Sequence, residues 1–182
     1  MAVLASLFVV GAEGLPASNS TPWNPTCQPH IVIPNGLKQM PFLAKDDHSC
    51  WCPEVESVSI PGTVEGIPRL SFNNCTKLTS VTIGKGVKSI GEHSFSITAI
   101  TSIAIPPSVT DINQGAFMSC DRLASATFGA GIKDIGPAAF WGTSLKAVKL
   151  PKNADYSGPK VPWYTFPKEC KVKGGHCTEG CL

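Results

Sequence analysis

A repeating unit of 22 to 23 residues is the feature that most constrains the fold of this chain. Cys52, Cys75, Thr98, Cys120 and Thr143 recur at intervals of 23, 23, 22 and 23 residues. Six columns of apolar residues keep the same register, and the last of them is aromatic: Phe72, Phe95, Phe117 and Phe140. One such unit cannot bury its apolar face alone, whereas stacked units can bury theirs against each other. The periodicity therefore predicts a solenoid with like residues in line.

Each unit contains a short segment, such as SVTI or SIAI, in which apolar and polar residues alternate. This alternation is typical of a strand with one buried face. A turn rich in Pro and Gly follows, and a second apolar pair, as in VKSI or VTDI, makes the return. No segment has the length and the 3.6-residue period of an amphipathic helix. We therefore expect parallel strands about 4.8 Å apart, one per unit.

Units such as LTSVTIGKGVKSIGEHSF and ITSIAIPPSVTDINQGAFMSC resemble the BspA-like leucine-rich repeats, whose pattern is L-x-x-V-x-I-P-x-x-V-x-x-I-G-x-x-A-F-x-x-C. The chain departs from this pattern at Ser94, Asn113, Thr98 and Thr143. The resemblance spans about Cys52 to Pro151. It implies a right-handed leucine-rich repeat solenoid with short parallel strands, irregular or 3-10 returns and little or no α-helix. It also implies a role in surface attachment and protein recognition, without catalytic residues.

The ends of the chain are expected to close the stack, because repeat arrays need shielding terminal units. We divide the chain into a signal segment (1–12), an N-terminal cap with a degenerate repeat (13–51), about four repeats (52–151) and a Cys-rich, aromatic C-terminal cap (152–182). In the first cap, Ile31, Ile33, Leu37 and Phe42 echo the repeat out of register. In the second, the segment CKVK is expected to add a last short strand.

Eight cysteines divide into a repeat column and two cap groups. Cys52, Cys75 and Cys120 share one column and are expected to be small buried side chains. Adjacent rungs would allow a bridge between Cys52 and Cys75. Cys75 and Cys120 lie two rungs apart, at about 9.6 Å, beyond the roughly 7 Å limit for a disulfide. The disulfide candidates are Cys27, Cys50, Cys170, Cys177 and Cys181, with Cys27–Cys50 as the natural upstream pair and one downstream cysteine left over.

This density of cysteines indicates an oxidising compartment. The apolar stretch MAVLASLFVVGA is too short to span a bilayer and resembles the core of a secretory signal. We expect an extracytoplasmic protein, secreted or on a surface, or one in an organelle lumen. A metal is the competing interpretation of two clusters: Asp46, His48, Cys50 and Cys52, and Cys170, His176, Cys177 and Cys181. Neither has paired C-x-x-C spacing, so disulfides are favoured and no metal or cofactor is predicted.

The remaining charge pattern and motifs give no indication of chemistry. The formal charge is +2 and no run of Lys or Arg stands out, which argues against nucleic acid as a partner. Nucleophile elbows, zinc-protease motifs and phosphate-binding loops are absent from the sequence. Asp111 and Asp134 occupy matching positions on solvated turns. The sequence therefore predicts a protein that is not an enzyme and that binds protein partners.

The outward positions of the strands are the expected binding face. They are small and weakly polar, and the candidates are Ser80, Thr82, Ser102, Ser125 and Thr127. Aromatic anchors are a second set of candidates: Trp141, Trp163, Tyr164 and Phe166. The alternative for these aromatics is to cover or plug the core. The predicted function is protein interaction or adhesion. A structural subunit of a larger assembly, docked on a membrane complex or in an organelle lumen, is the alternative, and ice binding by the flat face is a remote one.

Overall fold

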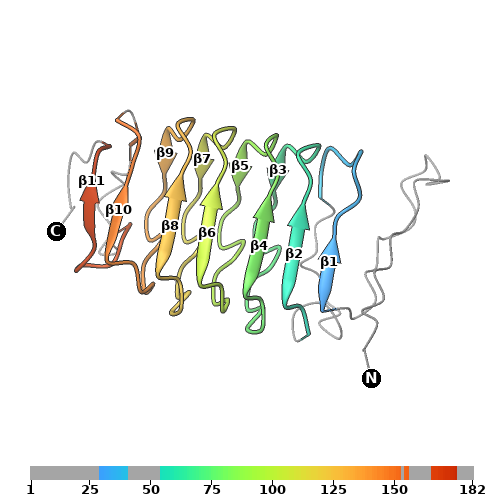
Figure 1. Cartoon of the computed structure of the whole chain (residues 1–182), viewed down its shortest axis with the longest axis horizontal. Coiled ribbons are helices and arrows are strands. Elements are labelled where there is room, and N and C mark those ends of the chain that lie inside the picture. Colours follow the sequence, from blue (N-terminus) through green and yellow to red (C-terminus); the bar gives the residue numbers. More distant parts are fainter. Residues whose placement is uncertain (1–28, 41–53, 153, 156–164, 176–182) are drawn as a thin grey trace, which may run out of the picture.

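The computed structural model describes residues 29–40, 54–152, 154–155 and 165–175, and in these the chain winds as a solenoid. One strand per turn lines up along the long axis (Figure 1). The strands of this ladder pair in parallel as β1-β2-β4, β6-β8 and β10-β11, and β4 lies beside β6 as β8 does beside β10. The bounds are β1 (His30–Val32), β2 (Ser57–Ile60), β4 (Ser80–Ile83), β6 (Ser102–Ile105), β8 (Ser125–Phe128), β10 (Ala147–Lys149) and β11 (Lys171–Lys173).

The return half of each turn forms a second parallel sheet. Its strands are β3 (Gly66–Ile67), β5 (Ser89–Ile90), β7 (Asp111–Ile112) and β9 (Asp134–Ile135), in the order β3-β5-β7-β9. The rest of each return is irregular, as expected, and no helix, 3-10 or α, occurs among the described residues. At the short strands of the returns, backbone amides bond to the neighbouring turn. The Lys88 N–H, for example, donates to the Glu65 carbonyl at 2.7 Å.

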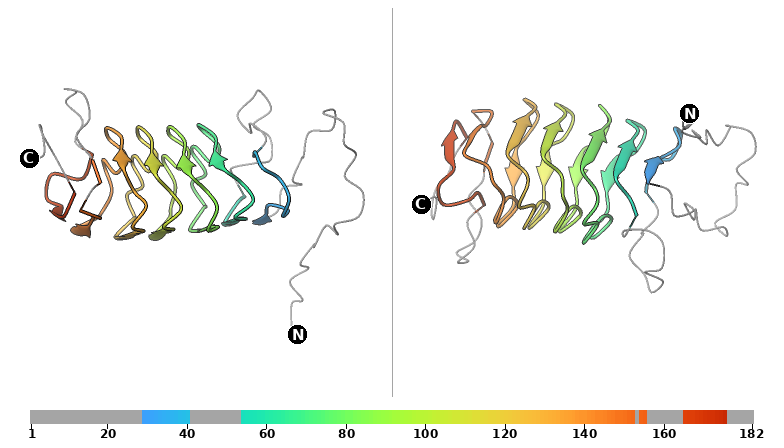
Figure 2. Two further views of the ribbon diagram at one scale, coloured as in Figure 1. Left: turned by 90° about the horizontal axis from the view of Figure 1, so that it is seen from above. Right: turned by 60° about the horizontal axis from the view of Figure 1, so that its bottom comes forward.

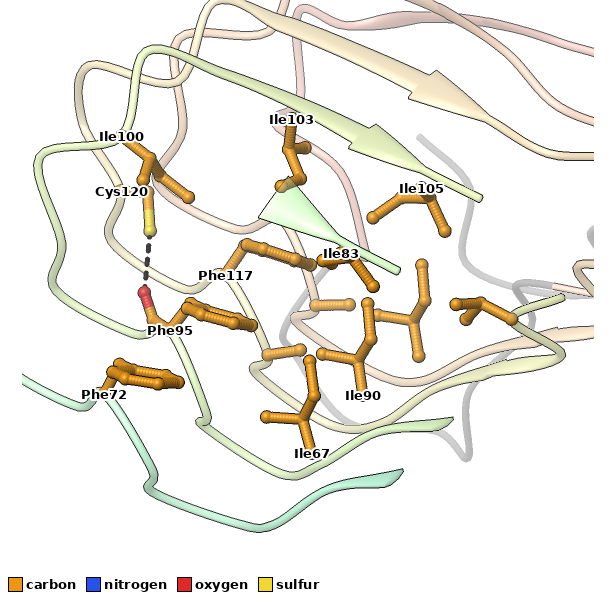
Figure 3. Close-up of a cluster of buried hydrophobic side chains, with 14 of the residues drawn as sticks. Ile67, Phe72, Ile83, Ile90, Phe95, Ile100, Ile103, Ile105, Phe117 and Cys120 are labelled. Atoms are coloured by element: carbon orange, nitrogen blue, oxygen red, sulfur yellow. Dashed lines mark hydrogen bonds between the residues drawn. The ribbon is translucent and has the colours of Figure 1, made fainter. Parts of the chain in front are cut away.

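The core consists of like residues stacked along the axis. The rings of Phe72, Phe95, Phe117 and Phe140 stack with centroids 5.2, 5.4 and 5.1 Å apart and interplanar angles of 8°, 7° and 11°. Figure 3 shows three of these rings beside the isoleucines that the strands turn inward. All four rings are fully buried. The aromatic column found in the sequence is thus a continuous spine.

The N-terminal segment adds a rung at a longer interval. β1 pairs with β2 in the register His30↔Ser57, which are 27 positions apart. Ile31 and Ile33 are buried at the ends of the Val58 and Ile60 columns, and a bridge joins Gln39 to Gly66. This segment therefore forms a first rung of the ladder. Its inward residue in the return is Met40, 4% exposed, whereas Phe42 lies outside the described residues.

The C-terminal segment also extends the stack. Phe166 is 5% exposed and its ring stacks on Phe140 at 5.2 Å and 3°. The Phe140 N–H donates to the Thr165 carbonyl at 2.7 Å, as the preceding spine residues donate to their own next turns. β11 then pairs with β10 in parallel, which confirms the predicted last strand. Both segments expected to be caps therefore supply turns of the solenoid.

The tight turns after β2, β4, β6 and β8 alternate between two types. Figure 2 shows these turns from above as successive loops. A Cβ at Gly86 would overlap the Gly62 carbonyl oxygen, and a Cβ at Gly131 would overlap that of Pro107. Glycine turns thus lie directly against the proline-containing turns that precede them. The alternating turns are 61–63 (PGT), 84–86 (GKG), 106–108 (PPS) and 129–131 (GAG).

Candidate functional site

The strand face comprises the outward side chains of β4, β6 and β8. Its residues are all exposed, because the alternation of each strand turns every second side chain away from the core. Parallel pairing aligns Ser102 with Ser125 and Ala104 with Thr127 in straight columns. The strand face thus contains every small polar residue predicted to bind. Its members are Ser80, Thr82, Ser102, Ala104, Ser125 and Thr127.

The strand face is flat, neutral and hydroxyl-rich. It carries no charged or aromatic side chain. Each hydroxyl can both donate and accept a hydrogen bond, and the hydroxyls repeat at the rung spacing of about 4.8 Å. The arrangement can form many weak, regularly spaced contacts but offers no large anchor of the kind that dominates most protein interfaces.

The predicted aromatic anchors do not gather on this face. Phe166 is buried in the spine, so it belongs to the core and is not an exposed anchor. Trp141 is half-buried, and its backbone N–H donates to Ala138 while its carbonyl accepts from Ser119. Trp163 and Tyr164 lie outside the described residues.

The described cysteines have three different environments. Cys75 is fully buried and disulfide-bonded, whereas Cys120 and Cys170 are free. The prediction that Cys75 and Cys120 are not bonded to each other is confirmed. Cys170 is half-buried and free, so the prediction that it forms a disulfide is not supported. The others, Cys27, Cys50, Cys52, Cys177 and Cys181, lie outside the described residues, so cap disulfides and a Cys52–Cys75 bridge stay predictions.

The buried Cys120 thiol is held inside the core by two hydrogen bonds. It donates to the Phe95 carbonyl at 3.0 Å, drawn in Figure 3, and lies 3.2 Å from the Thr98 hydroxyl. Burial raises the pKa of the Cys120 thiol, and the bond from Thr98 opposes that rise. Burial also raises the pKa of the half-buried Cys170. Both thiols are therefore poor nucleophiles near neutral pH, since the thiolate is the reactive form.

Other chemistry-bearing residues form no catalytic arrangement in the described part of the chain. Asp111 and Asp134 are register neighbours on the second sheet. Nowhere in the described ranges do three His, Cys, Asp or Glu side chains gather as a metal site. His30 Nδ1 lies 2.8 Å from Ser57 Oγ, a contact that the sequence did not indicate because the first rung has its own spacing. This contact is exposed and joins the first two strands of the ladder, β1 and β2.

Comparisons with known proteins agree with this architecture. A family model described as "BspA type Leucine rich repeat region (6 copies)" matches residues 46–167. No curated protein matches the chain significantly. The pneumococcal vaccine antigen PcpA has a similar structure, with TM-score 0.63 and 20% identity over 80% of this chain and 40% of that one. The leucine-rich repeat protein TpLRR of T. pallidum gives TM-score 0.62 and 23% identity over 81% of this chain and 74% of that one.

These similarities concern the fold, since the identities to the two structures are low. The chain spans less than half the length of PcpA and about three quarters of TpLRR. Among the segments that the structure describes, none forms a helix that could cross a membrane.

Proposed function

The chain belongs to the BspA-type leucine-rich repeat family, and from that membership we propose that it is a non-enzymatic adhesion and protein-interaction module. The strand face is the contact surface. The observation that supports this most directly is the uninterrupted exposure of its hydroxyl and methyl side chains over three consecutive rungs. Solenoids commonly use such a repeated, extended surface for recognition.

The chemistry of the strand face determines the kind of contact. Ser, Thr and Ala lose little side-chain entropy when they are buried, so a partner can cover them at low cost. Because large anchors are absent from this face, the affinity of a single contact is modest, and binding depends on covering several rungs at once. A partner with its own flat, polar surface fits this description.

The proposed compartment is outside the cytoplasm or in an organelle lumen. The chain contains eight cysteines, and Cys75 is disulfide-bonded in the structure. Disulfides persist in oxidising compartments and are rare in the cytosol. A reducing environment would therefore remove a bond that this fold contains.

A site-specific photo-crosslinker at Ser102, at the middle of the strand face, tests the proposal on cells of the native source. We expect defined crosslinked partners from the full chain, and loss of these partners when Thr82→Arg and Thr127→Arg place bulky charges on the face. The matched control carries Gln114→Arg and Ala130→Arg, at exposed positions away from the strand face. Equal capture by both double variants would overturn the assignment of this face.

A further inference from the structure

Four lysines lie on or next to the last two strands of the ladder. We name them the lysine platform: Lys146, Lys149, Lys171 and Lys173. β10 and β11 pair in the register Ala147↔Lys171 and Lys149↔Lys173, and the Lys171 N–H donates to the Lys146 carbonyl at 2.8 Å. All four side chains are exposed. The two strands lie side by side at the C-terminal end of the ladder in Figure 1. Pairing of two segments far apart in the sequence thus creates a charge cluster that no run of residues reveals.

The lysine platform is not neutralised by the charges around it. Lys77 pairs with Glu54 at 3.0 Å and His93 with Glu92 at 3.9 Å, whereas no platform lysine is in an ion pair with a described acidic residue. Lys149 and Lys173 lie directly opposite each other, and like charges in this arrangement destabilise a sheet. Their strands are only about 4.8 Å apart. The cluster opposes folding, and an anion bound across it would remove that repulsion.

We propose that the lysine platform binds an acidic polysaccharide, one that carries carboxylate or sulfate groups. This goes beyond the proposed function, because it assigns a different class of ligand to β10 and β11, with β8 shared between the two surfaces. Lysine ammonium groups are mobile point charges with three donors each, which suits anionic groups distributed along a polymer.

The neighbouring rungs favour a glycan over an acidic peptide. By the repeat interval of 22 residues, Lys149 follows Thr127 and Ala147 follows Ser125, and β10 contacts β8. A polymer lying across the strands would therefore pass from ammonium groups to hydroxyl groups that match sugar hydroxyls. The outward residues of β8 and β10 include no large apolar or aromatic side chain to anchor a peptide.

Fluorescence anisotropy with the full chain tests the proposal against four labelled probes of similar length. These are polygalacturonate, chondroitin sulfate, neutral dextran and polyglutamate. We expect both acidic glycans to bind and dextran not to bind. Raising the salt from about 50 to about 300 mM should weaken binding roughly tenfold, because exposed charges are screened over a few ångströms at the higher salt. The two glycans distinguish carboxylate from sulfate recognition.

Charge-neutralising variants locate the site. The double variant Lys149→Gln/Lys173→Gln should weaken glycan binding about tenfold or more, since each exposed ion pair contributes up to about fivefold. The control Lys88→Gln/Lys133→Gln removes the same charge from the second-sheet side and should change binding by less than about twofold. Lys149→Arg/Lys173→Arg should retain binding.

Folding and hydroxyl contacts are checked separately. The Lys149→Gln/Lys173→Gln variant should melt at the same or a higher temperature than the unmodified chain, because a repulsive pair has been removed.

Thr127→Val should weaken glycan binding and leave any polyglutamate binding unchanged. Polyglutamate binding as tight as that of the glycans would overturn the assignment to a polysaccharide. Equal weakening by the lysine variant and its control would overturn the site.

Discussion

Replacing the central ring of the phenylalanine spine is the sharpest test of how this solenoid is held together. Phe117 is fully buried, with Phe95 at 5.4 Å on one side and Phe140 at 5.1 Å on the other. Truncation to alanine in a core typically lowers the free energy of unfolding by about 3–5 kcal/mol. We expect Phe117→Ala to fall in the upper half of that range.

The reason is that the neighbouring rings cannot close the cavity. The Phe95 N–H donates to Ala116 and the Phe117 N–H donates to Ala139, both at 2.8 Å, so the backbone fixes the spacing of the turns. Phe117→Leu keeps most of the apolar volume and loses two stacked ring contacts, each worth about 0.5–1.5 kcal/mol. Its expected loss is therefore about 1–3 kcal/mol.

Urea-induced unfolding of the oxidised protein, followed by far-UV circular dichroism, measures both losses. Phe128→Ala is the comparator, because Phe128 is half-buried and its ring contacts Phe140 and Phe166 edge-on. It should lose less than Phe117→Ala. A loss below about 2 kcal/mol for Phe117→Ala, with an unchanged dependence on urea, would refute a rigid spine.

Three further changes test other features. Iodoacetamide should label Cys170 in the folded protein and Cys120 only in urea, as peptide mapping can show. Burial raises the pKa of the Cys120 thiol above its ordinary 9.0, so at higher pH the thiol ionises in the unfolded chain before it ionises in the folded one. The free energy of unfolding should therefore fall above that pH, and it should fall less steeply in Cys120→Ala. Ile97 has φ 58° and is 43% exposed, so Ile97→Asn should raise the unfolding free energy by about 1 kcal/mol in urea titrations, and a loss would contradict left-handed strain. Gly131→Ala should lower the free energy of unfolding by about 1–3 kcal/mol, because its Cβ would overlap the preceding turn. In the control Gly62→Ala the Cβ would come no closer than 3.2 Å to the next turn, so the loss should be smaller. Equal melting temperatures for the two variants would refute the close turn contact.

The regular part of the fold was predictable because every turn has nearly the same length. Strand register follows directly from the columns: Ser57 pairs with Ser80 and Val58 with Val81, as the interval of 23 requires. The spine follows for the same reason, since residues one period apart are stacked neighbours. The second sheet was not predictable, because a two-residue strand such as β5 has too few positions to show a period of two.

The irregular turns escaped prediction for a different reason. Met40 fills the Ile67 column at the longer interval of the first rung, and Phe166 continues the spine beyond a segment with no recognisable repeat. A fixed period cannot find either residue once a loop changes length. The lysine platform depends on the same kind of spacing, since it requires that Lys171 and Lys173 pair with β10. The outward orientation of the strand-face residues was predictable, because they lie entirely within the regular turns.

The alternation of proline and glycine turns limits how such an array can grow. In turns 84–86 and 129–131, a Cβ at any of the four glycines would overlap the backbone of the preceding turn, and Gly91 and Gly136 show the same crowding in the return. Deleting or duplicating a single unit would set two turns of one type against each other. A duplication of 45 residues, the distance from Pro61 to Pro106, keeps each of these glycine turns against a proline turn. Lengthening the regular array in steps of two units should therefore cost less stability than lengthening it by one unit.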